Sequence, residues 1–364
     1  MEQTSTQAST PNQKPAGRDG LLKRLEDGPV ICAEGYLFEF ERRGYLQAGA
    51  FVPEVVLEHP ELVEMLHRDF VHAGSDVVEA FTYYAHREKM KIIGREGDLE
   101  RINQQALRIA KTVAYDTGAL FAGNLCNTSV YNPADPDTHS AARRMFEEQV
   151  GWAADAGVDF IVGETFAYAG EALLATQAIK RASLPAVITL AIHKTDLTRD
   201  DLSVTAAAQR LENAGADVIG FNCIRGPWTM LPLLAELRAA VKCPIAALPV
   251  PYRTTPAEPT FQSLTDPGCD CIPGDRPFPT ALDPFVCNRY EIGEFAKQAY
   301  ALGARYLGVC CGAGPHHIRG MAEALGRKPP ASRYSPDMSK HILFGTDKKL
   351  NPHNVSYGEK LYGR

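Results

Sequence analysis

Short apolar runs alternate with longer amphipathic stretches along most of the chain. The runs are four or five residues long and often β-branched, which is typical of strands buried on both faces. They predict eight strands, at residues 30–33, 77–81, 120–123, 160–164, 186–190, 218–222, 245–248 and 306–309. The stretches between them place apolar residues at helical spacing, and several end in glycine just before the next run, as helices commonly do. This order predicts repeated βα units.

Eight such units can close into a (β/α)8 TIM barrel, whose active sites lie at the carboxyl ends of the strands. The main alternative is an open, doubly wound sheet. Its usual phosphate-binding pattern, G-x-G-x-x-G after the first strand, is missing from this chain. We therefore expect the barrel. Residues 249–297 are too many for a simple connection between the seventh and eighth strands, and they predict a long insertion over the barrel mouth.

The two ends of the chain differ from its middle in composition. Residues 1–20 are rich in Ser, Thr, Gln and Pro and have almost no large apolar side chains, which predicts a flexible tail. Residues 21–328 would form the zinc-binding barrel described below. Residues 329–364 are polar with scattered aromatic side chains, and they predict a short C-terminal arm that contacts a partner subunit.

Composition excludes several classes of protein. Hydrophobic residues make up 45% and charged residues 23% of the 364 residues, an ordinary balance for a globular protein. The formal net charge is -6 and no long Lys/Arg block occurs, so nucleic acid is not an expected partner. No apolar run of about 18 residues and no apolar leader occur, so we expect neither a membrane span nor a secretory signal. The expected compartment is the cytoplasm.

Three of the nine cysteines stand at predicted strand ends. Cys223 ends the sixth run, and Cys310 and Cys311 end the eighth, so only one strand would separate them in a barrel. Three thiolates from two loops suit a tetrahedral Zn²⁺ whose fourth position stays open. Gly312 would permit the sharp turn that lets two neighbouring cysteines bind one metal. Simple burial and a vicinal disulfide remain alternatives.

The other cysteines, two histidines and one glutamate receive ordinary structural interpretations. An odd number of cysteines in a long chain fits a reducing compartment. Four of them are expected to be small buried apolar side chains: Cys32, Cys126, Cys243 and Cys287. Cys269 and Cys271, in the insertion, are expected to be surface thiols. His316 and His317 should cap the last helix of the barrel, and Glu291 should begin the helix before it.

A zinc ion with three thiolates is a poor Lewis acid for hydrolysis because the sulfurs over-neutralise its charge. It can still deprotonate a fourth, incoming thiol and keep that sulfur electron-rich. Alkyl transfer to a substrate thiol is therefore the reaction class that this metal site favours.

Two motifs carry a family resemblance. G-F-N-C at 220–223 together with G-V-C-C-G at 308–312 resembles the homocysteine S-methyltransferase family, whose members are zinc-dependent barrels. The similarity is greatest to its betaine–homocysteine methyltransferase branch. It runs from about residue 21 to residue 332, through the segments ERRGY, VLEHPE, LHRDFVHAGSDV, AFTYYA, NAGADVIGFNC and GARYLGVCCG. The resemblance implies zinc held by Cys223, Cys310 and Cys311, and methyl transfer from a small onium donor to homocysteine, giving methionine.

The resemblance also implies roles for two substrate-binding residues. Glu164 matches the family's glutamate that anchors the amino group of homocysteine. Tyr84 matches a tyrosine that lines the donor cavity and occupies the open metal position at rest. Aromatic faces attract quaternary ammonium and sulfonium groups, so an aromatic lining suits a betaine-type donor.

The chain departs from the family pattern at positions around both substrates. The family's Asp-Gly falls at Ala33-Glu34, before Gly35, so Glu34 would have to replace the aspartate on the acceptor side. Phe51 stands in place of a tryptophan of the betaine cage, and Thr165 in place of a tyrosine. We therefore expect glycine betaine to be a poor donor and a related compound, such as a sulfoniopropionate or another betaine, to be the donor. The arm is shorter than in the animal enzymes, so we expect a homodimer instead of their tetramer.

Three rival interpretations remain at the level of sequence. One is a thiol methyltransferase with a different acceptor. Another is a non-catalytic protein that senses zinc or an onium compound, which the altered positions Ala33, Glu34 and Thr165 motivate. A third is a structural zinc site closed by a fourth protein ligand.

Overall fold

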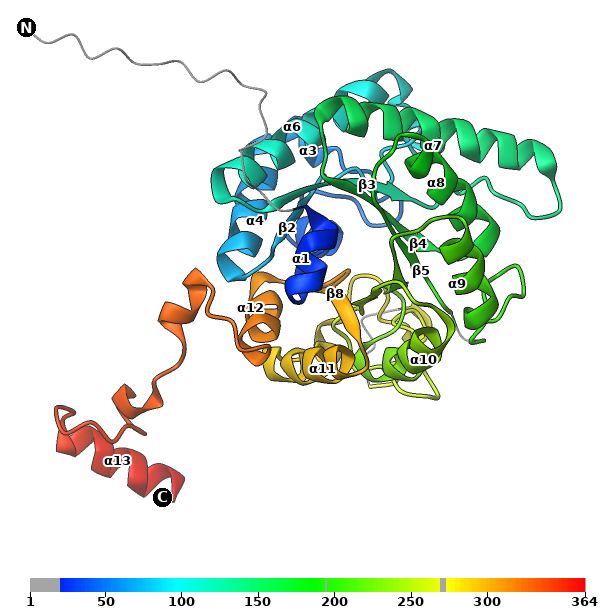
Figure 1. Cartoon of the computed structure of the whole chain (residues 1–364). Helices are drawn as coiled ribbons and strands as arrows, with labels where there is room; N and C mark the ends of the chain where they lie inside the picture. The colour runs from blue at the N-terminus through cyan, green and yellow to red at the C-terminus, as the bar shows by residue number, and fades with distance from the viewer. Residues whose placement is uncertain (1–19, 194, 269–272, 364) are drawn as a thin grey trace, which may run out of the picture.

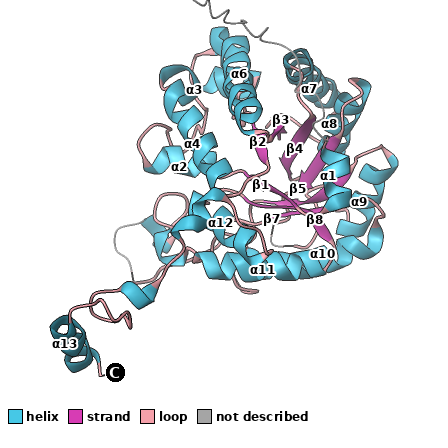
Figure 2. Ribbon diagram, turned by 60° about the vertical axis from the view of Figure 1, so that its left-hand side comes forward, coloured by secondary structure: helices cyan, strands magenta, loops and turns pink. Residues whose placement is uncertain are grey.

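The computed structural model describes residues 20–193, 195–268 and 273–363. Eight parallel strands form a closed barrel with helices around it (Figures 1 and 2). The strands are β1 (Val30–Ala33), β2 (Val77–Glu79), β3 (Leu120–Cys126), β4 (Phe160–Phe166), β5 (Ala186–Leu190), β6 (Val218–Asn222), β7 (Ile245–Leu248) and β8 (Ala304–Val309). Each strand pairs with its neighbour in sequence, and β8 closes the ring against β1. This confirms the (β/α)8 barrel and excludes the doubly wound sheet.

Four strands differ in length from the sequence prediction. β2 ends at Glu79, two residues early, because the chain then turns toward Tyr84, whose φ of 61° leaves the extended region. β3 and β4 continue to Cys126 and Phe166, because their pairing extends as far as Cys126 opposite Glu164. β8 begins two residues early, at Ala304, which pairs with Ile245.

The predicted helical stretches all lie in helices. The helices are α1 (Leu21–Asp27), α2 (Tyr36–Arg42), α3 (Val55–Glu58), α4 (Pro60–Ala73), α5 (Arg87–Ile92), α6 (Leu99–Thr117), α7 (Pro136–Ala156), α8 (Ala169–Arg181), α9 (Val204–Asn213), α10 (Pro227–Ala240), α11 (Arg289–Ala301), α12 (Pro315–Ala324) and α13 (Pro352–Tyr362). Gly74 and Gly157 end α4 and α7 in the left-handed conformation, as expected from the glycines before the strands.

Helix α1 packs against the barrel interior at the end opposite the site. Leu21 and Leu25 belong to the same buried cluster as Val30, Phe160 and Tyr306 of the barrel. In Figure 1 this helix lies across the centre of the ring of strands. Because the side chains at that end are apolar, α1 keeps water out of the barrel.

The insertion between β7 and α11 lies over the other end of the barrel. Its residue Phe261 donates its backbone N–H to the carbonyl of Ile224, just beyond β6, at 2.9 Å. Phe261 and Phe278 both contact the ring of Phe38 from α2. The insertion therefore forms a wall of the mouth, as the sequence predicts. Cys269 and Cys271 lie outside the described residues, as do residues 1–19 of the predicted tail.

The C-terminal arm leaves the barrel after α12 and ends in α13 at a distance from it (Figure 1). Within the arm, Phe344 contacts the ring of Tyr362 at 5.2 Å between centroids, so α13 packs on the segment before it. Six large apolar side chains of the described arm remain more than half exposed: Tyr334, Met338, Ile342, Tyr357, Leu361 and Tyr362.

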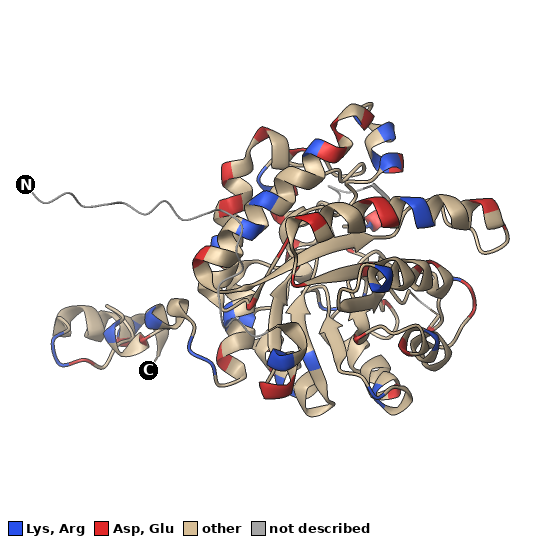
Figure 3. Cartoon of the chain, turned by 45° about the horizontal axis from the view of Figure 1, so that its top comes forward, with Lys and Arg blue, Asp and Glu red and all other residues tan. Residues whose placement is uncertain are grey.

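Figure 3 shows Lys and Arg interspersed with Asp and Glu over the outer helices. Among the described residues, no helix combines the length and the apolar character needed to cross a membrane.

Replacing Leu21 tests the packing of α1. Leu21 is 1% exposed, so Leu21→Ala should lower the free energy of unfolding by about 2–5 kcal/mol through the cavity it leaves. Chemical denaturation measures this. Leu22, on the same helix but 43% exposed, is the matched control, and Leu22→Ala should change stability by less than about 0.5 kcal/mol. Equal losses in the two variants would contradict the buried role of Leu21.

Candidate metal centre and substrate cavities

Three cysteine side chains meet at the mouth of the barrel. Cys223 follows β6, and Cys310 and Cys311 follow β8, and their Sγ atoms all lie within 4.8 Å of one another. All three are free thiols, and the Sγ atoms of Cys310 and Cys311 are 3.9 Å apart, which excludes a vicinal disulfide. A tetrahedral zinc ion with Zn–S bonds of about 2.3 Å separates its sulfur ligands by about 3.8 Å. The donor set therefore fits zinc.

Strained backbone holds Cys223 in place. Cys223 and Ile224 have φ angles of 56° and 54°, which is rare for residues other than glycine and more so for a β-branched one. A hydrogen bond of 2.9 Å from the Cys223 N–H to the carbonyl of Leu248 at the end of β7 ties this turn to the barrel. Strain of this kind concentrates at functional sites.

Gly312 makes the turn after the two neighbouring cysteines possible. Its φ is 92°, and a Cβ atom there would lie 2.2 Å from the hydroxyl of Tyr252. The backbone N–H of Cys310 bonds the carbonyl of Pro249 at 2.9 Å. The glycine therefore serves as predicted, and it also allows Tyr252 to approach.

The thiols share their protons unequally. Hydrogen bonds from Cys310 and Cys311 lower the pKa of Cys223 well below its usual value. Burial raises the pKa of Cys310, and the bond to Cys223 raises that of Cys311. The other two thiols therefore stabilise the ionised form of Cys223.

Three buried glutamates lie next to the thiols, joined by two asparagines. The Nδ2 atom of Asn124 donates to Glu79 and to Glu164, at 2.6 Å each. The Nδ2 atom of Asn222 donates to Glu164 at 2.6 Å and to Glu34 at 3.3 Å. A narrow cavity lined by these carboxylates also touches Cys310 and Cys311.

No positively charged side chain is paired with these three buried carboxylates among the described residues. Burial, and then their mutual repulsion, raise the pKa of Glu34 and of Glu164 well above the usual value, and burial raises that of Glu79 to about 7. Glu34 Oε1 is buried without a hydrogen-bond partner among the described residues. Such a site is suited to a ligand that brings positive charge and N–H donors, such as an ammonium group.

Gly35 has a packing role. A Cβ atom at this position would lie 2.2 Å from the carbonyl oxygen of Ala313. The absence of a side chain therefore lets the segment after β1 approach the turn that follows Cys311. The neighbouring Glu34 donates its N–H to the carbonyl of Val309, at 3.1 Å.

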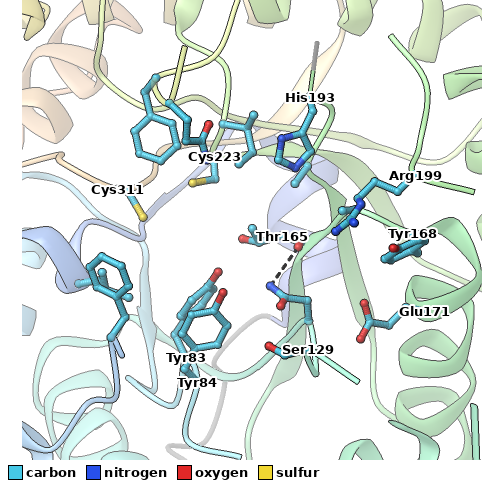
Figure 4. Close-up of a pocket in the computed structure, with 18 of the residues that line it drawn as sticks. Tyr83, Tyr84, Ser129, Thr165, Tyr168, Glu171, His193, Arg199, Cys223 and Cys311 are labelled. Atoms are coloured by element: carbon cyan, nitrogen blue, oxygen red, sulfur yellow. Dashed lines mark hydrogen bonds between the residues drawn. The ribbon is translucent and has the colours of Figure 1, made fainter. Parts of the chain in front are cut away.

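A larger cavity of about 440 Å³ opens on the other side of the thiols (Figure 4). It contains Cys223 and Cys311, and aromatic side chains form one wall: Phe38, Phe51, Phe261 and Phe278. Phe51 has a φ of 55° and stacks on Phe38 with 5.9 Å between ring centroids. The structure thus places Phe51 at the cavity, as the sequence predicts.

Tyr84 also lines this cavity, but its ring already has close neighbours. Lys89 Nζ lies 4.0 Å from the ring centroid, and the ring of Tyr83 lies 4.4 Å away. Burial raises the pKa of Tyr84 to about 12, so the hydroxyl is neutral in the metal-free site. The role of Tyr84 as a resting metal ligand stays a prediction.

Thr165 lies between the two cavities. Its backbone N–H donates to Asn222 Oδ1 at 2.9 Å, and its hydroxyl donates to Glu164 Oε2 at 3.2 Å. Its φ of 59° turns the end of β4 toward the large cavity.

Sequence reasoning missed several residues of the site. Glu79 and Asn222 are the last residues of β2 and β6, and Asn124 lies two residues before the end of β3. A search of every polar residue near a strand end would therefore have found them. Tyr83 lines both cavities. No sequence signal pointed to Arg199, which enters the large cavity from the loop after β5.

The remaining predictions have mixed outcomes. His317 caps α12, accepting from the Gly314 N–H at Nδ1 and bonding the Cys287 carbonyl through Nε2. Glu291 completes a capping box with Asn288 at the start of α11. Cys32, Cys126 and Cys287 are buried, as predicted. Cys243 is only half-buried, because it lies in the turn between α10 and β7 and not within a strand, so that prediction was wrong.

The fold and the site together define a barrel protein with a three-thiol centre between two small-molecule cavities. Comparison with known proteins then identifies its family. The sequence model of the family described as homocysteine S-methyltransferase matches residues 35–325. The chain belongs to the homocysteine S-methyltransferase family, and it is a methyltransferase.

Curated relatives and a solved structure agree with this. The S-methylmethionine–homocysteine S-methyltransferase of Mus musculus is 36% identical over 352 residues, covering 93% of this chain and 90% of its own. Betaine–homocysteine S-methyltransferase 1 of Danio rerio is 36% identical, covering 91% and 81%. The metallated form of the homocysteine methyltransferase MmuM from Escherichia coli has the same fold, with a TM-score of 0.63 at 18% identity, covering 83% and 98%.

Buried Glu79 should make stability depend on pH. The folded chain keeps the Glu79 proton up to about pH 7, whereas the unfolded chain releases it near the usual pKa of 4.5. The folded state therefore binds more protons between these values, and the free energy of unfolding should fall as pH rises, by on the order of 3 kcal/mol.

Denaturation of the metal-free protein at pH 5 and pH 8 measures this difference. Glu79→Gln removes the titrating proton but keeps an oxygen that can accept from Asn124. It should lose part of the fall in stability. A pH dependence equal to that of the wild type would contradict the assignment.

Proposed function

We propose that this protein is a zinc-dependent S-methyltransferase that transfers a methyl group from a betaine-type or sulfonium donor to homocysteine, giving methionine. One observation carries the proposal: the thiol cluster lies between two chemically different cavities, and Cys311 lines both. The carboxylate-lined cavity suits an ammonium, and the aromatic-lined cavity suits an onium group. A methyl group could thus pass between two substrates that meet at the thiols.

Cys223, Cys310 and Cys311 would hold the zinc, since their number and the spacing of their Sγ atoms suit it. When bound, zinc would lower the pKa of an incoming thiol and keep its sulfur nucleophilic. The homocysteine methyltransferase MmuM of Escherichia coli, which has this fold, has been solved in a metallated form.

Glu164 and Glu34 would bind the ammonium of the acceptor. Both carboxylates are buried within reach of Asn222, and the ammonium would supply the positive charge that the three-glutamate cluster lacks. In this arrangement Glu34 would replace the missing aspartate of the family pattern. The curated relatives are named for homocysteine, which carries this ammonium.

On the donor side, Phe38, Phe51 and Phe261 would surround the onium group. Transfer needs no general acid, because the donor departs as a neutral amine or thioether. The aromatic walls would exclude water and hold the methyl carbon in line with the acceptor sulfur. The family pattern has a tryptophan at the position of Phe51 and a tyrosine at that of Thr165, so this wall offers less aromatic surface to a quaternary ammonium group. Glycine betaine should therefore be a poor donor.

Metal content and activity test the proposal together. Zinc-loaded protein with homocysteine and each donor in turn, namely glycine betaine, dimethylsulfoniopropionate, proline betaine and S-methylmethionine, should yield methionine by mass spectrometry from at least one donor. Cys310→Ala should lower zinc affinity by at least about 100-fold and abolish methionine formation. Chelation of the wild type should do the same, and added zinc should restore activity.

Cys287→Ala is the matched control, because Cys287 is equally buried but lies outside the thiol cluster. It should keep full zinc content and activity. No methionine from any donor at full zinc occupancy would overturn homocysteine as acceptor and favour another thiol or a sensor.

We also propose a homodimer in which the arm contacts the second subunit. Tyr357 and Leu361 lie four residues apart on α13 and are both about half exposed, so they present one apolar face. The wild type should sediment at twice 39.8 kDa, and the double variant Tyr357→Glu/Leu361→Glu at the monomer mass. Ile92→Glu, at an exposed apolar position on the barrel, should leave the dimer intact. A monomeric wild type would exclude this assembly.

A further inference from the structure

The turn formed by residues 310–312, the thiol turn, is held by a side chain from another segment. The carbonyl of Gly312 accepts a hydrogen bond from Nη1 of Arg42 at 3.2 Å. Nη2 of the same guanidinium donates to the hydroxyl of Tyr252 at 3.0 Å. Arg42 is the last residue of α2, and Tyr252 lies at the start of the insertion after β7. One arginine therefore joins three segments at the thiol turn.

Tyr252 is fixed in place at the base of the insertion. Its side chain is 0% exposed. Its backbone forms an antiparallel bridge with Val286, near the other end of the insertion. Its ring stacks on Phe261, in the aromatic wall of the large cavity, with 6.0 Å between ring centroids. The hydroxyl therefore has a defined position, against which Arg42 can hold the thiol turn.

The ordinary roles of an arginine at the end of a helix do not account for these contacts. Such a cation commonly interacts with the last carbonyls of its own helix, but the two hydrogen bonds of Arg42 go to other segments. Asp283 lies 3.9 Å away and is 76% exposed, so this ion pair contributes little to stability. Two acceptors on one guanidinium match its planar fork, which lysine lacks.

The thiol turn needs support from outside because its geometry is demanding. Two neighbouring cysteines must direct their Sγ atoms to one point, and those atoms are 3.9 Å apart, close to the spacing of about 3.8 Å in a tetrahedral zinc site. Gly312 follows them with a φ of 92°, and fixing a glycine costs more conformational entropy than fixing any other residue. A donor to the carbonyl of this glycine restrains the peptide group that ends the turn.

We propose that Arg42 is a positioning residue of the metal centre. Through the carbonyl of Gly312 and the hydroxyl of Tyr252, it holds the thiol turn so that both of its thiols face Cys223 across one metal position. The guanidinium also brings a positive charge near a centre that three thiolates would leave negative even with zinc bound. This inference rests on the proposed function, because zinc at the three thiols is itself proposed.

The zinc affinity of the full-length protein measures the effect. Arg42→Met keeps the apolar stem of the side chain and loses both hydrogen bonds, so it should weaken zinc binding by about 10- to 100-fold. Tyr252→Phe keeps the stack on Phe261 and loses one hydrogen bond, so it should weaken zinc binding by about 3- to 10-fold. In the double variant the two losses should not add, because the hydroxyl of Tyr252 acts through Arg42.

Arg43→Met is the matched control. Arg43 adjoins Arg42 and has nearly the same side-chain exposure, 31% against 32%, but it bonds Glu39 of α2 instead of the thiol turn. This variant should keep the zinc affinity of the wild type. Arg42→Lys keeps the charge without the planar fork, so its zinc affinity should fall between those of the wild type and Arg42→Met.

Cobalt(II) in place of zinc reports the geometry of the centre, because its visible absorption depends on the number and arrangement of its thiolate ligands. Cobalt-loaded Arg42→Met should lose intensity in the thiolate-to-cobalt band relative to the wild type, whereas Arg43→Met should reproduce the wild-type spectrum. A role in stability alone would lower the melting temperature and leave the spectrum of the folded protein unchanged.

Alkylation of the metal-free protein tests the thiol turn without a metal. Cys310 is 2% exposed, and Cys32, inside the barrel, is 0% exposed. In Arg42→Met, local opening of the thiol turn should raise the rate at which iodoacetamide labels Cys310 by at least about 10-fold and leave that of Cys32 unchanged. Peptide mass spectrometry measures both rates.

Three results would overturn the role of Arg42: wild-type zinc affinity and cobalt spectrum in Arg42→Met, an equal loss in Arg43→Met, or wild-type behaviour of Arg42→Lys. If the wild type binds zinc but forms no methionine from any donor, the proposed function fails, and the zinc affinities still decide the positioning role. If the wild type binds no zinc, the labelling rates decide it. Faster labelling of Cys310 alone supports the role, and equal rates, or faster labelling of Cys32 as well, overturn it.

Discussion

The closed ring of parallel strands constrains every group of the site, because it brings the carboxyl ends of all eight strands to one mouth. Cys223 leaves β6 and Cys310 leaves β8, and the carbonyls that receive their backbone N–H groups, those of Leu248 and Pro249, belong to the end of β7 between them. The spacing of the thiols is therefore a property of barrel closure. Local turn geometry, with positive φ at Cys223 and Gly312, completes it.

The same closure separates two kinds of chemistry around one centre. Toward the barrel axis, Glu34, Glu79 and Glu164 are buried close to one another at a cost in stability that a cationic ligand would offset. Toward the insertion, Phe51 and Phe261 line a wider cavity. The thiols therefore lie between a cavity lined by carboxylates and a cavity lined by aromatic side chains.

The charged wall of the large cavity comes from segments that carry none of the three thiols. Arg199 belongs to the loop after β5, and Glu171 to the first turn of α8. Backbone bonds and the carboxylate of Asp200 fasten these two segments together. Residues of this wall can therefore be substituted without disturbing the three thiols, since the two sets of residues lie on different strands and loops.

The sequence by itself determined the eight strands, the order of the βα units and the position of the three cysteines at strand ends. These features are local patterns, since apolar runs, amphipathic stretches and the residues that follow a run can all be recognised within a short segment. It also placed Glu164, Phe51 and Thr165 at the site through family motifs. Only the tertiary structure decided that Glu79 and Asn124 join Glu34, that Lys89 covers the ring of Tyr84, and that Arg199 faces the thiols. These contacts link residues far apart in the chain, and their distances depend on barrel closure and loop packing, which no local pattern records.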